Sequence, residues 1–134
     1  MAALNHVTIA APRNGTATHT VTPSSGSVVA GSLFTPTAGR FLVCVVEGAV
    51  TSTTPSGWTL PSGGSAINYT GLYVWYRTAA GSDSFTTTHN GSNYPVVFDF
   101  YEFPSSTSWV NSVAATGVDP GGGAGPTLSG LTGT

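Results

Sequence analysis

The carboxylates are the first candidates for chemistry, because paired Asp and Glu side chains can act as general acid and base. Asp99 and Glu102 lie three residues apart within one predicted strand. Side chains alternate between the faces of a strand, so these two point to opposite faces and cannot form the facing pair of a glycosidase. We therefore expect Asp99 to form hydrogen bonds in or near the core and Glu102 to lie at a rim. Glu47 interrupts an apolar run, and its expected role is an ion pair with Arg40 or Arg77.

The histidines and the single cysteine form no other recognisable catalytic or metal-binding pattern. His6, His19 and His89 are scattered along Thr-rich segments, and none has a second ligand at the spacing of a metal site. Histidines that meet in space, as on the axis of a symmetric oligomer, are the alternative. Cys44 stands in an apolar run and is expected to be a small buried hydrophobe. The sequence therefore predicts no enzyme, no metal and no cofactor.

Charge is scarce in this chain. Only 6% of the residues are charged, with three Arg, no Lys and five acidic residues, against about 25% in an average protein. Nucleic acids and anionic membranes are bound through clustered cations, so neither partner is expected. No signal peptide is expected at the start, and no apolar run is long enough to span a bilayer. Few charges also leave association unopposed, which favours a homo-oligomer.

Turn-forming residues divide the chain into short segments that suit strands. Gly, Pro and β-branched residues recur too often to leave room for a helix. Short strands separated by turns are typical of a sandwich. We therefore expect an all-β fold, an antiparallel, jelly-roll-like β-sandwich over residues 1–117. The predicted strands cover residues 6–10, 16–22, 27–34, 40–48, 70–78, 84–89, 94–103 and 108–115.

The C-terminal residues 118–134 differ in composition. Gly and Pro dominate residues 118–126, as in a flexible spacer. Residues 127–134 have the composition of a strand that is cut off. We expect this segment either to dock on a partner or to continue into a longer protein.

Apolar patterning identifies the candidate core. The run at 40–48 shows no alternation, which predicts that both faces of this strand are buried. Trp58 follows the next loop and is expected to plug the core. The candidate core residues are Phe41, Val43, Val45, Trp58, Leu72, Val74, Val96, Phe98 and Phe100.

The chain has more aromatic side chains than a small core needs. Within residues 70–78, Tyr73, Trp75 and Arg77 share the face opposite to the candidate core residues. If that face is external, it can stack on glycan rings or pack against a neighbouring subunit. Packing in the core or in an interface is the simpler interpretation. The candidate interface or glycan contacts are Tyr73, Trp75, Arg77, Tyr101 and Trp109.

Five segments between residues 40 and 103 occur in an order that resembles a known kind of module. They are Arg40–Val46, Pro55–Thr59, Leu72–Ala79, Phe85–Thr86 and Val96–Phe103. The order is similar to that of Gly/Ser/Thr-rich β-sandwich modules in minor tail proteins and other virion structural proteins of tailed phages that infect actinobacteria. In those modules a buried strand leads to a P-x-G-W-T turn and then to an aromatic strand that ends near Arg or Lys.

The resemblance implies a non-enzymatic bacteriophage virion protein with no catalytic residues. A minor tail protein on the particle surface, made in the host cytoplasm, is the expectation. A head (capsid) decoration protein and a carbohydrate-binding host-adsorption module are the alternatives. The expected partners are other virion proteins, further copies of the chain and, for the adsorption module, a host surface glycan.

Overall fold

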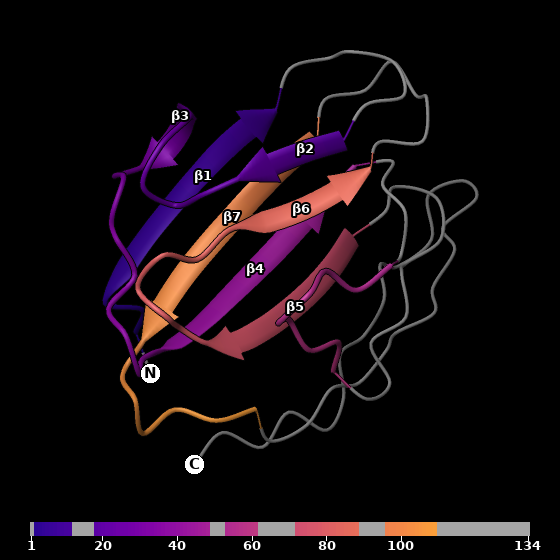
Figure 1. Cartoon of the computed structure of the whole chain (residues 1–134). Coiled ribbons are helices and arrows are strands. Elements are labelled where there is room, and N and C mark those ends of the chain that lie inside the picture. The colour runs from indigo at the N-terminus through magenta and orange to yellow at the C-terminus, as the bar shows by residue number, and fades with distance from the viewer. Residues whose placement is uncertain (1, 12–17, 49–52, 62–71, 89–95, 110–134) are drawn as a thin grey trace, which may run out of the picture.

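The computed structural model describes residues 2–11, 18–48, 53–61, 72–88 and 96–109 (Figure 1). No helix occurs in these ranges, and every strand pairing is antiparallel. The predicted all-β antiparallel sandwich is therefore confirmed. The strands are β1 (Asn5–Ala11), β2 (Thr18–Val21), β3 (Ser27–Gly31), β4 (Phe41–Glu47), β5 (Leu72–Thr78), β6 (Phe85–Thr88) and β7 (Val96–Phe103).

Two sheets form the sandwich. The larger sheet has the strand order β3-β1-β7-β4-β5, and β2 and β6 form a smaller sheet that lies across it (Figure 1). The long strand β7 occupies the centre, where it pairs with β1 on one side and with β4 on the other. Because β1 and β7 come from opposite ends of the described chain, the fold closes only when distant segments meet.

The hydrophobic core fills the space between the two sheets. From the larger sheet it receives alternate residues of β7, namely Val96, Phe98 and Phe100. Val21 of β2 and Phe85 of β6 pack against them from the smaller sheet. Phe85 lies 6.0 Å from Phe98, measured between ring centroids. Burial of these apolar side chains is the main stabilising contribution to such a fold.

The sequence analysis placed several core residues correctly. Val96, Phe98, Phe100 and Trp58 are all buried members of the core. Val43 is buried too, although it lies on the opposite face of β4 from the core residues Leu42, Cys44 and Val46.

Three other core assignments need correction. Phe41, Val45 and Val74 are only partly buried. They lie on the outer face of the larger sheet, the face that points away from β2 and β6. The neighbouring positions of opposite parity enter the core instead, because only one face of an outer layer can meet the second sheet. The side chain of Leu72 lies outside the described residues, as do residues 110–134 with the predicted spacer at 118–134.

Candidate functional site

The candidate chemical residues do not gather into one centre. No group of three or more His, Cys, Asp or Glu within the described ranges could hold a metal ion. His6 lies on β1 and His19 on β2, whereas His89 is outside the described residues. Within the same ranges there is also no helix of the length and apolarity that a membrane crossing requires.

A polar cluster lies on the outer face, where β1 pairs with β7. The register sets Thr8 opposite Asp99 and His6 opposite Tyr101. The Thr8 hydroxyl donates a hydrogen bond to Asp99 Oδ1, and His6 Nε2 lies 3.4 Å from the same oxygen. The rings of His6 and Tyr101 stack at a centroid distance of 4.5 Å. Asp99 thus forms a hydrogen bond as expected, but the expected location in or near the core is wrong, because Asp99 lies on the face of β7 opposite to the core residues.

This cluster lacks the order of a nucleophilic triad. In a triad the imidazole stands between the hydroxyl and the carboxylate, so that it can take the proton of the hydroxyl. Here Thr8 donates directly to Asp99, and His6 lies beside both groups. Burial raises the pKa of the Tyr101 phenol, and the nearby Asp99 carboxylate raises it further. Tyr101 therefore keeps its proton and serves as a packing group.

Glu102 is the clearest correction at the level of single residues. We expected it at a rim, but its side chain is fully buried on the core face of β7. Its carboxylate accepts hydrogen bonds from Asn5 Nδ2 at 2.9 Å, from Arg40 Nη1 at 2.9 Å and from the backbone amide of Thr37. Three donors from distant parts of the chain therefore replace the water that this carboxylate loses on burial.

The pKa of Glu102 follows from these contacts. Burial by itself raises the pKa of the carboxyl group. The hydrogen bonds from Thr37, Asn5 and Arg40, together with the positive charge of Arg40, lower it by more, so the pKa lies below its usual value. Glu102 is consequently a structural anion and not a proton donor near neutral pH.

The expected ion pairs of Glu47 are also wrong. Arg40 pairs with Glu102, and Arg77 Nε lies 3.0 Å from Asp83 Oδ1. Glu47 is exposed at the end of β4. Sequence spacing could not reveal the true partners, because the acidic residue of each pair comes from a different strand or turn than the arginine.

The Gly-Trp-Thr turn fixes Trp58 in the core. The amide of Trp58 donates to the carbonyl of Pro55 at 3.1 Å, and Gly57 adopts a φ of 79°, as the third residue of a type II turn requires. The Trp58 indole Nε1 donates to the carbonyl of Ser84 at 2.9 Å. Its ring makes an edge contact with Phe85 at 5.2 Å. The motif is therefore a structural plug for one end of the sandwich.

Arg77 and Asp83 brace this plug. The Arg77 guanidinium lies 5.7 Å from the ring centroid of Trp58, within the range of a cation–π interaction. Asp83 is buried and also accepts hydrogen bonds from the amides of Ala80 and Gly81, each at 3.0 Å. The sequence analysis missed this role of Asp83. The composition Ala-Gly-Ser-Asp is typical of a turn, but it does not indicate the ion pair with Arg77.

Trp75 is not available as an external contact. Its side chain is fully buried, and its ring lies 5.0 Å from Phe85 in the core. Tyr73 stacks on Trp75 at 5.3 Å and packs against the same core. This face of β5 therefore points inward, toward the smaller sheet. The Trp75 ring packs there against Phe85 of β6. The interpretation of this face as an external surface for glycan rings is therefore wrong, because Trp75 is buried in the core.

The aromatic side chains that do lie on the outer face form a continuous group. We call it the outer aromatic row. The strand register places Val43 between Tyr101 and Tyr76 and sets Phe41 beside Phe103. Trp109 extends the row, because its ring stacks on Tyr76 at 5.4 Å with an interplanar angle of 4°. The row consists of Phe41, Tyr76, Tyr101, Phe103 and Trp109, and all five are partly buried.

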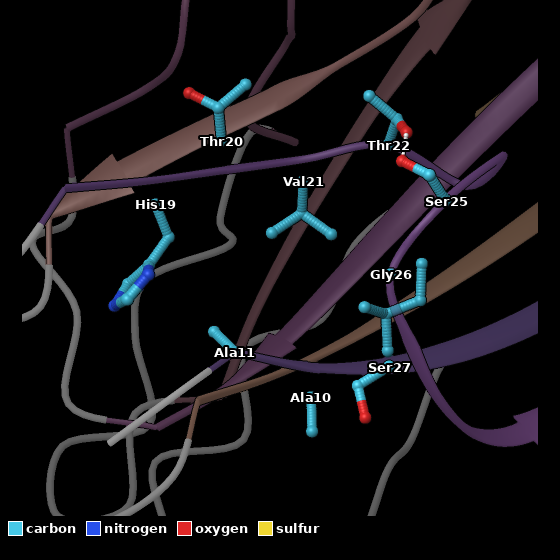
Figure 2. A pocket seen from close by; sticks show the side chains of 10 residues that line it. Ala10, Ala11, His19, Thr20, Val21, Thr22, Ser25, Gly26 and Ser27 are labelled. Carbon is cyan, nitrogen blue, oxygen red and sulfur yellow. Dashed lines mark hydrogen bonds between the residues drawn. The ribbon is translucent and has the colours of Figure 1, made fainter. Parts of the chain in front are cut away.

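A cleft of about 570 Å³ opens between β1, β2 and the turn that leads into β3 (Figure 2). Its wall combines aliphatic side chains with hydroxyl groups, and the hydroxyls of Thr22 and Ser25 lie 2.9 Å apart. Among the described residues that line the cleft, none is Asp, Glu, Lys or Arg, and His19 is the one that can act as an acid or a base. The lining residues are Ile9, Ala10, Ala11, His19, Thr20, Val21, Thr22, Ser25, Gly26 and Ser27.

Comparisons of this chain with protein-family models, with curated proteins and with solved structures find no match.

Proposed function

We propose that this chain is a non-enzymatic structural protein of a bacteriophage particle, most simply a minor tail protein on the particle surface. The observation that carries the proposal is the way the few charges are used. Arg40 is paired with the buried Glu102, and Arg77 is paired with the buried Asp83. The described surface is left with hydroxyl, amide and apolar groups and with few charges, which suits a subunit covered by neighbours.

The arrangement of the chemical residues favours the same proposal. Three acidic side chains form hydrogen bonds that hold the fold together. Glu102 and Asp83 accept hydrogen bonds from the backbone of loops, and Asp99 accepts one from the hydroxyl of Thr8. The P-x-G-W-T turn, which carries most of the resemblance to phage tail modules, is a structural plug around Trp58. A fold alone does not define a function, so the argument depends on these residues.

Mass spectrometry of gradient-purified particles of the phage that encodes the chain tests the proposal. Chymotrypsin is the suitable protease, because the sequence has no Lys and three Arg but is rich in Tyr, Phe and Trp. We expect peptides of the chain at a copy number well below that of the major capsid protein. A copy number close to that of the capsid protein favours the head-decoration alternative. Absence of the chain from particles whose other structural proteins are detected overturns the proposal.

Recognition of a host cell-wall glycan is a second candidate, favoured by the outer aromatic row. Aromatic rings stack on the apolar faces of sugars, and Tyr101 lies beside the polar groups of Asp99 and Thr8. If this candidate holds, Tyr101→Ala weakens binding to isolated host cell walls about tenfold. Val29→Ala is the control, because Val29 is an exposed apolar residue of β3, and β1 separates β3 from the strands that carry the row. Equal binding of both variants contradicts this candidate.

A further inference from the structure

Within the described ranges, the larger sheet has one covered edge and one open edge. At the β5 edge, Thr59 exchanges two backbone hydrogen bonds with Tyr76, at 2.8 and 3.0 Å. At the other edge, β3 pairs with β1 alone, and no further strand of the described ranges lies beyond it. All five residues of β3 are exposed. No described strand thus pairs with the outward backbone groups of β3, which can pair with another chain.

Apolar side chains gather at this open edge. Among the five large hydrophobic residues that are exposed within the described ranges, three lie in β3 or directly after it, and they are Val28, Val29 and Leu33. The amide of Ser32 donates to the carbonyl of His6 at 3.0 Å, which brings the segment after β3 beside the start of β1. Exposed apolar residues that cluster in this way mark an interaction site more often than scattered ones do.

The strand register explains why Val29 stands out. The pairing passes from Thr8 opposite Ala30 to Ile9 opposite Val28, so Val29 is the extra residue of a bulge. Its side chain is 62% exposed. Bulges usually limit edge pairing, but here the bulge displays an apolar side chain with no charged guard. A partner at this edge would therefore bind through a short stretch of backbone and through side-chain packing.

The charge pattern indicates what the partner is. No Asp, Glu, Lys or Arg occurs between Arg13 and Arg40, so the open edge carries no charge of either sign. Two identical edges of this kind meet without repulsion, whereas a partner selected by opposite charge finds nothing to recognise. An antiparallel strand pairs with its own copy about a two-fold axis, and each side chain then meets its symmetry mate or a close neighbour.

We propose that two copies of the chain associate through β3, antiparallel across a two-fold axis. Val28 and Val29 of both copies form the centre of this interface, and Leu33, which follows β3, lies at its end. The interface deepens the proposed function, on which it rests, because it names a contact through which the virion protein assembles. It also extends the larger sheet continuously from one copy into the next.

Light scattering on a size-exclusion column tests the interface with the whole purified chain. We expect the wild type to have twice the chain mass of 13.5 kDa. Val29→Lys is expected to halve the measured mass with an unchanged far-ultraviolet circular dichroism spectrum, because a Lys at the edge charges both sides of the contact. Leu60→Lys is the matched control, since it makes the same change at an exposed apolar residue elsewhere, and it stays dimeric.

A cysteine variant tests the same interface without the added charge of Val29→Lys. Under mild oxidation Val29→Cys is expected to form a disulfide-linked dimer, and Leu60→Cys is not. The native Cys44 does not interfere, because it is buried. A monomeric wild type, a Val29→Lys variant of unchanged mass, or equal cross-linking at both positions overturns the interface.

The two proposals can fail separately. A chain found in particles but monomeric in solution retains the proposed function and loses the β3 interface. A dimer that Val29→Lys dissociates, formed by a chain that is absent from particles, retains the interface and loses the function.

Discussion

Buried charge is the main feature at the scale of single residues. Glu102 and Asp83 are buried acids, and each is met by an arginine and by backbone amides. Burying a charge is costly unless it is paired and fully hydrogen-bonded. Glu102 therefore joins segments that are far apart in sequence, whereas Asp83 closes the turn that follows β5. Each carboxylate is stable only when all of its donors have come together.

The first prediction concerns Glu102 and acid. Its pKa is lower in the folded chain than the usual 4.5, so the carboxylate stabilises the fold above that pH, and the contribution is lost as the pH falls through the folded-state pKa. Glu102→Gln is expected to reduce the free energy of unfolding by roughly 1.5–3 kcal/mol at neutral pH. Urea denaturation from neutral pH into the acid range should show the difference between variant and wild type shrinking below pH 4.5.

Glu47→Gln is the control for this experiment, because Glu47 is exposed. It should change the free energy of unfolding by less than about 0.5 kcal/mol. A difference between Glu102→Gln and wild type that stays constant with pH would contradict the account of this carboxylate.

The second prediction concerns Cys44. Burial raises the pKa of its thiol well above the usual value, and the charge of Asp99 raises it further. Only the thiolate is reactive, so the native chain is expected not to react with Ellman's reagent. One thiol per chain should react after denaturation. Rapid labelling in native buffer would mean that β4 does not hold Cys44 in the core.

At the scale of elements, the Gly-Trp-Thr turn connects the two layers. Trp58 enters the core only because Gly57 permits the positive φ of the turn. A Cβ on Gly57 would lie 3.3 Å from Arg77 Nη1. Arg77 has little freedom to move, because it lies between Asp83 and the ring of Trp58. The Gly-Trp-Thr turn, Arg77 and Asp83 are therefore packed together, so that a change in one displaces the others.

The third prediction separates two requirements at Gly57, the positive φ of the turn and the close approach of Arg77. Gly57→Ala is expected to lower the free energy of unfolding by the cost of a positive φ, about 1–2 kcal/mol, and by a further amount from the contact with Arg77. Gly39→Ala is the matched control, because Gly39 has a φ of 84° and nothing within 4 Å of an added Cβ. Urea denaturation of both variants should show the larger loss for Gly57→Ala. Equal losses would show that Arg77 is not tightly held.

The sequence predicts which face of a strand is buried only where polar residues mark the other face. In β7 the alternation of apolar residues with Asp99 identifies the core face correctly, and Val96, Phe98 and Phe100 are buried. In β5 both faces carry large apolar side chains, so nothing in the sequence indicates that Trp75 points inward. Either assignment satisfies the pattern.

The partners of the buried acids were beyond sequence reasoning for a different reason. Asn5, Thr37 and Arg40 lie 97, 65 and 62 residues from Glu102 in the chain. Only the pairing of β1 and β4 with β7 brings them together. The open β3 edge, by contrast, had a signal that was not used: the absence of charge between Arg13 and Arg40.

At the scale of the whole molecule, the two edges of the larger sheet differ in the described residues that cover them. Thr59 covers one edge of the larger sheet, and β3 leaves the other edge open with its apolar residues exposed. The outer aromatic row adds a partly buried apolar surface on the face away from the smaller sheet. A chain with so few charges has little to keep copies apart. These features of the described residues support the proposal that the chain assembles with further copies and with other proteins.

Immunogold electron microscopy tests this account most directly. Antibodies raised against the purified chain are applied to intact particles of the phage that, under the proposed function, encodes it, with particles of an unrelated phage as the control. We predict gold label on the tail of the particles. Intact particles without label on either tail or head, when an antibody against a known tail protein does label them, would contradict the claim that this chain is a surface component of the virion.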